Sequence, residues 1–131
     1  MVHSFLGAIL IPAALILAAS ETPPQEATEV DVTLANFSFA PNPIQLEADH
    51  RYILKLNNTA SGGHSFSAPE FFKTAQVDAA DQPLIRKGKV DVPGGSTVAV
   101  RLKTGAAGTY KLKCTHFLHS GFGMTGQIVV T

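Results

Sequence analysis

From residue 30 to the end of the chain, apolar and polar residues alternate in short stretches separated by turns rich in glycine, proline and asparagine. A period of two is typical of strands with one buried face, because successive side chains point to opposite faces of a sheet. Many short strands separated by turns favour an all-β fold, an antiparallel Greek-key sandwich or barrel of seven or eight strands. The strands are predicted at residues 30–37, 44–48, 52–56, 89–92, 97–102, 109–114 and 127–130.

One stretch inside this pattern predicts a short helix near residues 69–76. Pro69 and Glu70 suit the first turn of a helix, and Ser67 is a candidate for its N-terminal cap. The residues that follow, 77–88, show no regular period and are expected to be irregular.

The first twenty residues differ in composition from the rest of the chain. Residues 5–19 are almost wholly apolar but fall short of the ~20 residues that a spanning helix needs. Small residues follow, so we interpret residues 1–20 as a secretory signal peptide, cleaved near Ser20–Glu21. Because no Lys or Arg precedes the apolar run, an uncleaved anchor is the alternative. Residues 21–29 are expected to be a linker and 30–131 one domain, located in the periplasm or secreted.

The net charge of the chain gives no reason to expect a polyanionic partner. Ten basic and ten acidic side chains cancel, so nothing in the net charge favours nucleic acid or an anionic membrane. Arg86, Lys87 and Lys89 form a local basic cluster, which we expect to be a solvated loop. His50 lies in a predicted turn and is also expected to be solvated.

Cys114 is the only cysteine of the chain. A lone cysteine in an exported domain forms no internal disulfide, which leaves a buried inert thiol, an intermolecular bridge or a metal ligand. Alternation places Cys114 on one face of its strand with Tyr110 and Leu112, and Lys111 and Lys113 on the other. Since the lysine side must face water, the thiol is expected to point inward at the end of the strand.

The loop after Cys114 contains further donors of the same kind. His119 and Met124 follow it, so a thiolate, an imidazole and a thioether lie within residues 114–124. This soft set suits copper better than magnesium or calcium, and the thioether argues against zinc. An electron-transfer copper site requires a second imidazole. His64, which follows two glycines, is the leading candidate.

These segments resemble a known family, the cupredoxins, which include plastocyanin, pseudoazurin and azurin. The stretch 110–130 is similar to their ligand loop and last strand, and the stretch 57–66 to their upstream histidine loop. The resemblance covers about residues 30–131. It implies a cupredoxin-like sandwich that holds one copper ion through His64, Cys114, His119 and Met124.

The chain departs from the family pattern in two places. Four residues separate Cys114 from His119, as in azurin, whereas plastocyanin-like loops have two. The longer spacing contains another histidine, His116, which is the alternative ligand to His119. Ser65 stands where the family commonly has an asparagine that ties the two ligand loops together, so we expect a looser tie here, for which Asn57 or Asn58 could compensate.

The resemblance implies a carrier of single electrons that alternates between Cu(I) and Cu(II), with no catalytic residues and no enzymatic activity. Redox partner proteins are expected to dock transiently on an apolar patch formed by His119, Phe117, Leu118 and Phe122. The mature protein is expected to be a monomer that binds neither nucleic acid nor membrane. The alternative function is a periplasmic copper-binding or delivery protein whose copper does not undergo redox cycling.

Overall fold

We describe the fold from a computed structural model, for residues 7–14, 25–116 and 123–131. Residues 7–14 are exposed and have no regular secondary structure. No helix in the described part of the chain is both long and apolar enough to cross a bilayer.

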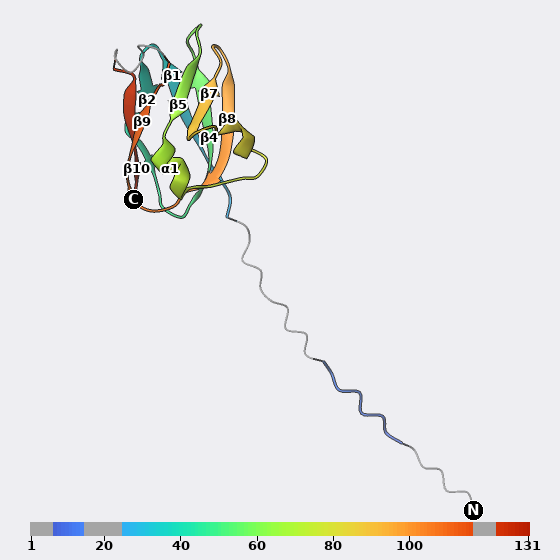
Figure 1. Ribbon diagram of the computed structural model, residues 1–131. Helices are drawn as coiled ribbons and strands as arrows, with labels where there is room; N and C mark the ends of the chain where they lie inside the picture. The colour runs from blue at the N-terminus through green and yellow to red at the C-terminus, as the bar shows by residue number, and fades with distance from the viewer. Residues whose placement is uncertain (1–6, 15–24, 117–122) are drawn as a thin grey trace, which may run out of the picture.

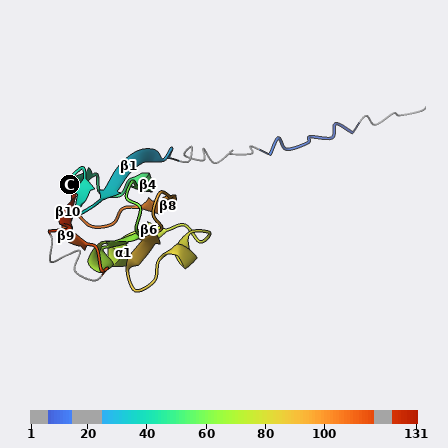
Figure 2. The same cartoon turned by 90° about the horizontal axis from the view of Figure 1, so that it is seen from above.

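Two β-sheets pack face to face and form a sandwich (Figure 1, Figure 2). The first sheet has the strand order β2-β1-β4-β8-β6, and the second has the order β3-β10-β9-β5-β7. The strands are β1 Thr28–Ala35, β2 Ser38–Ala40, β3 Ile44–Leu46, β4 Arg51–Asn58, β5 His64–Ser67, β6 Gln76–Val77, β7 Lys89–Val92, β8 Thr97–Lys103, β9 Gly108–Lys113 and β10 Thr125–Val130. The predicted all-β sandwich with one short helix is confirmed.

The strands are more numerous and more varied in direction than the alternation predicted. Each of the seven predicted strands has a counterpart, and β2, β5 and β6 are additional. Most neighbouring strands are antiparallel, but β1 pairs with β4 in parallel and β3 pairs with β10 in parallel. The predicted antiparallel pairing therefore holds for most neighbouring strands but not for these two pairs. Residues 76–77, expected to be helical or irregular, pair with β8 at the edge of the first sheet.

The core lies between the sheets and is built from the inward side chains of both. Strand β4 shows the principle most clearly, since every second residue from Tyr52 to Asn58 is buried. Full burial of one aliphatic side chain contributes about 1.5–3 kcal/mol. Summed over all the buried side chains, this burial offsets the conformational entropy that the chain loses when it folds. Fully buried members from the two sheets include Val32, Leu34, Leu54, Leu56, Val100, Leu102, Phe66 and Ile128.

The short helix α1 spans Pro69–Thr74 and closes one side of the sandwich (Figure 1). Its N-terminal cap is Ala68, which makes no side-chain hydrogen bond, so the prediction that Ser67 caps the helix was wrong. Ser67 instead ends strand β5 and is buried. The helix is anchored by Phe71 and Phe72, which are both buried. Their rings make an edge-to-face contact, with the ring centroids 5.4 Å apart.

Candidate metal centre

Cys114 follows the last residue of β9 and is fully buried. The period of two along β9 puts it on the inward face with Leu112, while Lys111 and Lys113 are exposed, as predicted. Its amide N–H donates to the carbonyl oxygen of Met124, 3.1 Å away. Cys114 and Met124 therefore sit opposite each other at the point where β9 and β10 separate, and the Met124 side chain is also fully buried.

His64 is the first residue of β5 and is 1% exposed. Its Nδ1 atom lies 3.8 Å from the sulfur of Cys114. In zinc proteins, metal–nitrogen and metal–sulfur bonds are about 2.0 and 2.3 Å, together about 4.3 Å. Since the two atoms lie closer than this sum, one ion could contact both. The structure thus brings together two predicted ligands that are far apart in the sequence.

The other nitrogen of the His64 ring is held by Asn36, in the turn between β1 and β2. Its Nε2 atom is 2.9 Å from the Oδ1 atom of Asn36. An amide oxygen accepts, so Nε2 carries the proton and Nδ1 presents its lone pair toward the sulfur of Cys114. A metal-binding histidine is commonly oriented in this way by an acceptor on its far side. No pattern in the sequence pointed to Asn36, because only the fold brings the two residues together.

Ser65 ties the two halves of the site together. Its backbone N–H is 3.3 Å from the sulfur of Cys114 and its hydroxyl oxygen is 3.7 Å from it. The same hydroxyl oxygen accepts a hydrogen bond from the amide of Thr115 at 2.8 Å and lies 2.9 Å from the Thr115 hydroxyl. One short side chain therefore contacts both the sulfur and the residue after it, and so joins the two segments of the site.

The loop before His64 is shaped by Asn58, a buried residue at the end of β4. Its side-chain amide donates to the carbonyls of Gly62 and Val92, each at 2.9 Å. Its Oδ1 atom accepts from the amide of Ala60 at 2.9 Å. These three hydrogen bonds fix the loop that leads into β5, and so they fix the position of His64.

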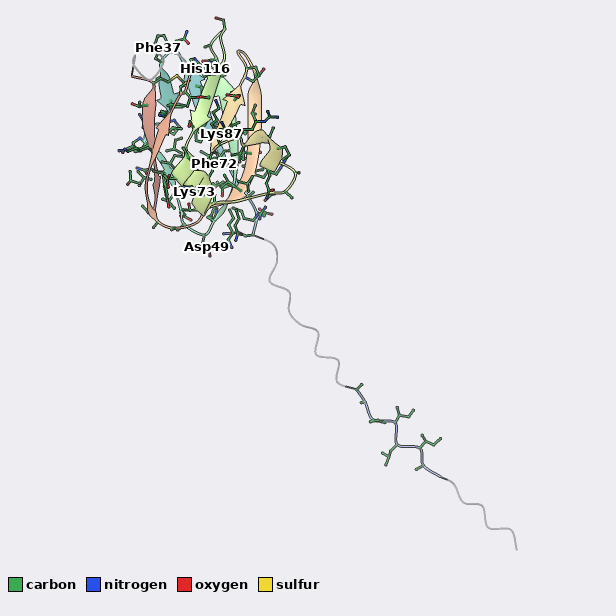
Figure 3. The ribbon with its side chains drawn as sticks, viewed as in Figure 1. Phe37, Asp49, Phe72, Lys73, Lys87 and His116 are labelled. Atoms are coloured by element: carbon green, nitrogen blue, oxygen red, sulfur yellow. The ribbon has the colours of Figure 1, made fainter. Side chains whose placement is uncertain are left out.

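His116, the alternative ligand, lies beside His64 at the rim of the site (Figure 3). The two ring centroids are 6.4 Å apart, with the rings edge to face. The His116 ring packs over Gly63, where an added Cβ would lie 3.2 Å from its Cε1 atom. A side chain at position 63 would therefore press on the His116 ring.

The other predicted site residues, His119, Phe117, Leu118 and Phe122, lie outside the described residues, and their roles remain predictions. Among residues 7–14, 25–116 and 123–131, no three His, Cys, Asp or Glu side chains are grouped to hold a metal ion. The structure does bring together the His64 imidazole, the Cys114 thiol and the buried Met124 just before β10, with His116 at the rim.

Solved structures with the same architecture include several whose names refer to copper. Auracyanin A, described as a "blue" copper protein from Chloroflexus aurantiacus, matches with a TM-score of 0.58 and 18% identity over 81% of this chain and 100% of that one. Reduced auracyanin from Roseiflexus castenholzii has a TM-score of 0.58 and 15% identity over 80% and 98% of the two chains. McoA multicopper oxidase from Aquifex aeolicus has a TM-score of 0.60 and 17% identity over 86% of this chain but 32% of its own.

At these identities, the structural likeness establishes the fold. No curated protein sequence matches the chain significantly. The family model of the cupredoxin-like domain matches residues 7–130, which include both sheets and both segments of the candidate site. The chain therefore belongs to the cupredoxin-like domain family.

Proposed function

We propose that this chain is an exported blue copper protein, a carrier of single electrons rather than an enzyme. Its copper ion would be held by His64, Cys114, His119 and Met124. The observation that carries this proposal is the pair formed by His64 and Cys114, with Nδ1 of the ring 3.8 Å from the sulfur. The name of auracyanin A, a blue copper protein of the same fold, supports it.

The donors fit copper by their chemistry. A thiolate, imidazoles and a weak thioether form the set that electron-transfer copper sites use. When bound, copper supplies the one-electron chemistry, by alternating between Cu(I) and Cu(II). The chain supplies the rest. It buries Cys114 and His64 at 0% and 1% exposure, holds the ring through Asn36 and directs two donors of Ser65 toward the sulfur.

This rigidity is what a carrier requires. Ligands that are fixed before and after the transfer move little when the charge of the site changes, so the barrier to electron transfer is low. The hydrogen bonds of Asn58 and Ser65 tie the ligand-bearing segments to the sheet. These hydrogen bonds would keep the ligands in nearly the same positions in both oxidation states.

Partner proteins would dock at the end of the sandwich where the ligands lie. The proposed apolar patch consists of His119, Phe117, Leu118 and Phe122. Phe37 supports this position, because it follows Asn36 in the β1–β2 turn at the same end of the molecule as His116 (Figure 3), and the residue is 39% exposed. An exposed aromatic beside a redox site favours brief, close contacts.

The proposed location is the periplasm or the cell exterior, with residues 1–20 removed as a signal peptide. The apolar run 5–19 and the small residues after it support this location. Mass spectrometry of the protein recovered from the periplasmic fraction would show whether the chain begins near Glu21. An intact N-terminus in the membrane fraction would instead show an anchor.

The function is tested by adding Cu(II) to the purified metal-free protein. We expect an intense visible absorption band from the copper-bound thiolate, which ascorbate removes and hexacyanoferrate(III) restores. Zn(II) serves as the control, since it binds similar donors but gives no such band. Binding of colourless Cu(I) without reversible redox chemistry would contradict the carrier function and support copper delivery.

A further inference from the structure

The two sheets differ in how their basic side chains are neutralised. On the first sheet and its loops, four basic residues each form an ion pair with an acidic residue at 2.9–3.2 Å. These pairs are Arg51–Asp78, Lys55–Glu29, Arg101–Asp81 and Lys103–Asp49. The positive charge of the first sheet is therefore largely compensated locally.

The second sheet carries basic residues without such compensation. Within the described part of the chain, none of its five has a carboxylate within the 4.0 Å of an ion pair. They are Arg86, Lys87, Lys89, Lys111 and Lys113, which we name the lysine face. The neighbouring Lys73 does form a pair, 3.6 Å from Glu70, and Asp91 is the carboxylate on β7. The charges of the whole chain cancel, so the lysine face is a local excess on one side of a neutral protein.

The strand register gathers these charges on one side. Ser67 of β5 is paired with Lys113 of β9 on one side and with Lys89 of β7 on the other. Residues paired across a sheet point to the same face, so the two lysines flank Ser67 in one row. Lys111 lies two residues before Lys113 and points the same way. The segment 86–89 is a tight turn whose last residue begins β7, and Arg86 and Lys87 are exposed there, as expected of a solvated loop.

One member of the lysine face is connected to the copper ligands. The Nζ atom of Lys89 donates to the hydroxyl oxygen of Thr115 at 3.4 Å. The Thr115 hydroxyl lies 2.9 Å from that of Ser65, which lies 3.7 Å from the sulfur of Cys114. A continuous hydrogen-bonded path thus leads from the exposed face to the thiol, so a protein bound there would lie close to the site.

We propose that the lysine face binds an acidic redox protein, which docks beside Cys114 and exchanges its electron there. This inference rests on the proposed function, and it adds a second docking surface to the apolar patch. Exposed ion pairs contribute little individually and are screened by salt. Several together speed up encounter without prolonging the complex. An electron carrier needs both fast binding and fast release of its partner.

An acidic protein fits the lysine face better than an anionic membrane or a nucleic acid does. Glu70 and Asp91 border the lysines and are exposed, so they would repel a membrane or a nucleic acid backbone that approached across the whole face. An acidic protein can place its carboxylates opposite the lysines and other groups opposite these two residues.

The test uses the ¹⁵N-labelled, copper-loaded protein in the Cu(I) state, titrated with a decaglutamate peptide at low ionic strength. Amide shifts are expected in β7, β9 and residues 86–88. In the double variant Lys111→Gln/Lys113→Gln, the dissociation constant should rise about fivefold. The matched control, Lys55→Gln/Lys103→Gln, removes the same charge from the first sheet and should change the constant less than about twofold.

Electron exchange provides the second readout. The rate of oxidation of the Cu(I) protein by hexacyanoferrate(III), a small anion, should fall several-fold in Lys111→Gln/Lys113→Gln and little in the control, while the absorption band of the Cu(II) form is unchanged in both. Equal effects of the two double variants on binding and on rate would show that only net charge matters, and would overturn the proposal.

Two further outcomes would also overturn it. Peptide shifts scattered over both sheets would show that the face is not a binding surface. Sedimentation with phosphatidylglycerol vesicles without localised peptide shifts would assign the face to a membrane. The peptide titration does not depend on redox cycling, so a protein that binds the peptide but fails the Cu(II) colour test would contradict the proposed function alone.

Discussion

The two ends of the sandwich each contain a histidine, and the two rings are used in different ways. At the end marked by Asp49 in Figure 3, both nitrogens of the His50 ring meet neighbouring side chains, the amide of Gln25 and the hydroxyl of Thr28, each at 2.9 Å. The ring also packs on Tyr52, with centroids 4.7 Å apart. His50 is only 22% exposed, so the prediction that it is solvated was wrong. This ring fastens the start of β1 to the β3–β4 turn.

At the opposite end, His64 has one nitrogen on Asn36 and directs the other toward the sulfur of Cys114. Both ends therefore fix an imidazole, but only one of them aims a ring nitrogen at a soft donor. The His64 ring is also the more deeply buried, but the clearest difference between a structural histidine and a candidate ligand here is what surrounds each ring nitrogen.

The largest expected effect comes from Cys114→Ser at the site end. A hydroxyl is a poor ligand for copper compared with a thiolate, and it gives no intense visible band. We expect complete loss of the blue colour while the fold persists, checked by absorption and circular dichroism on the same sample. A variant that stays blue would refute Cys114 as the ligand.

Asn36→Ala should have the next largest effect. Without its acceptor, Nε2 no longer fixes the ring and its tautomer, so copper affinity should fall by about 10–100-fold. Competition with a chelator of known affinity would measure this. The control is Asn57→Ala, which removes an exposed partner of Thr97 from the first sheet and should leave the affinity unchanged. An unchanged affinity in Asn36→Ala would show that the ring is held by other contacts.

Ser65→Ala should change the redox behaviour without removing copper. Donors to the sulfur stabilise its negative charge more in the Cu(I) state, so losing the hydroxyl should lower the reduction potential. One hydrogen bond of about 0.5–1.5 kcal/mol corresponds to roughly 20–60 mV. Ser67→Ala, at the other buried serine of β5, is the matched control in cyclic voltammetry. A raised potential, or an equal change in both variants, would contradict this role.

His50→Gln should have the smallest effect on the site and acts only on stability. It removes a ring that packs on Tyr52 and contacts Thr28, which should lower the free energy of unfolding by about 1 kcal/mol. Urea denaturation would measure this loss, and the copper absorption should be unchanged. A shifted band would show that the two ends are coupled.

The parts of the fold that the sequence predicted are those set by local alternation. The inward position of Cys114 follows from the polar lysines on either side of Leu112, because one strand carries the whole pattern. Strand β5 was missed because it is only four residues long, and its two serines, although they share one face, are as buried as the residues between them. Sequence periodicity detects a strand with one wet face and overlooks one that is covered on both.

The sequence predicted which residue types would bind the metal, but not which residues hold these ligands in position. The soft donors could be recognised from their types and spacing, and the need for a second imidazole, together with the resemblance, pointed to His64. Asn36, Thr115 and Lys89 could not be found in this way, because their roles depend on which strands pair and which turns meet. The difference in ion pairing between the sheets has the same origin, since it concerns residues that are distant in the chain.

The hydrogen bond from the amide of Cys114 to the carbonyl of Met124 fastens the ligand loop at its base. Strand pairing resumes directly beyond it, with Lys113 opposite Thr125. The segment between the two ends can thus be treated as an exchangeable module on a fixed frame. Grafting shorter or longer loops between these two residues should retune the colour and the potential while the rest of the molecule keeps its register.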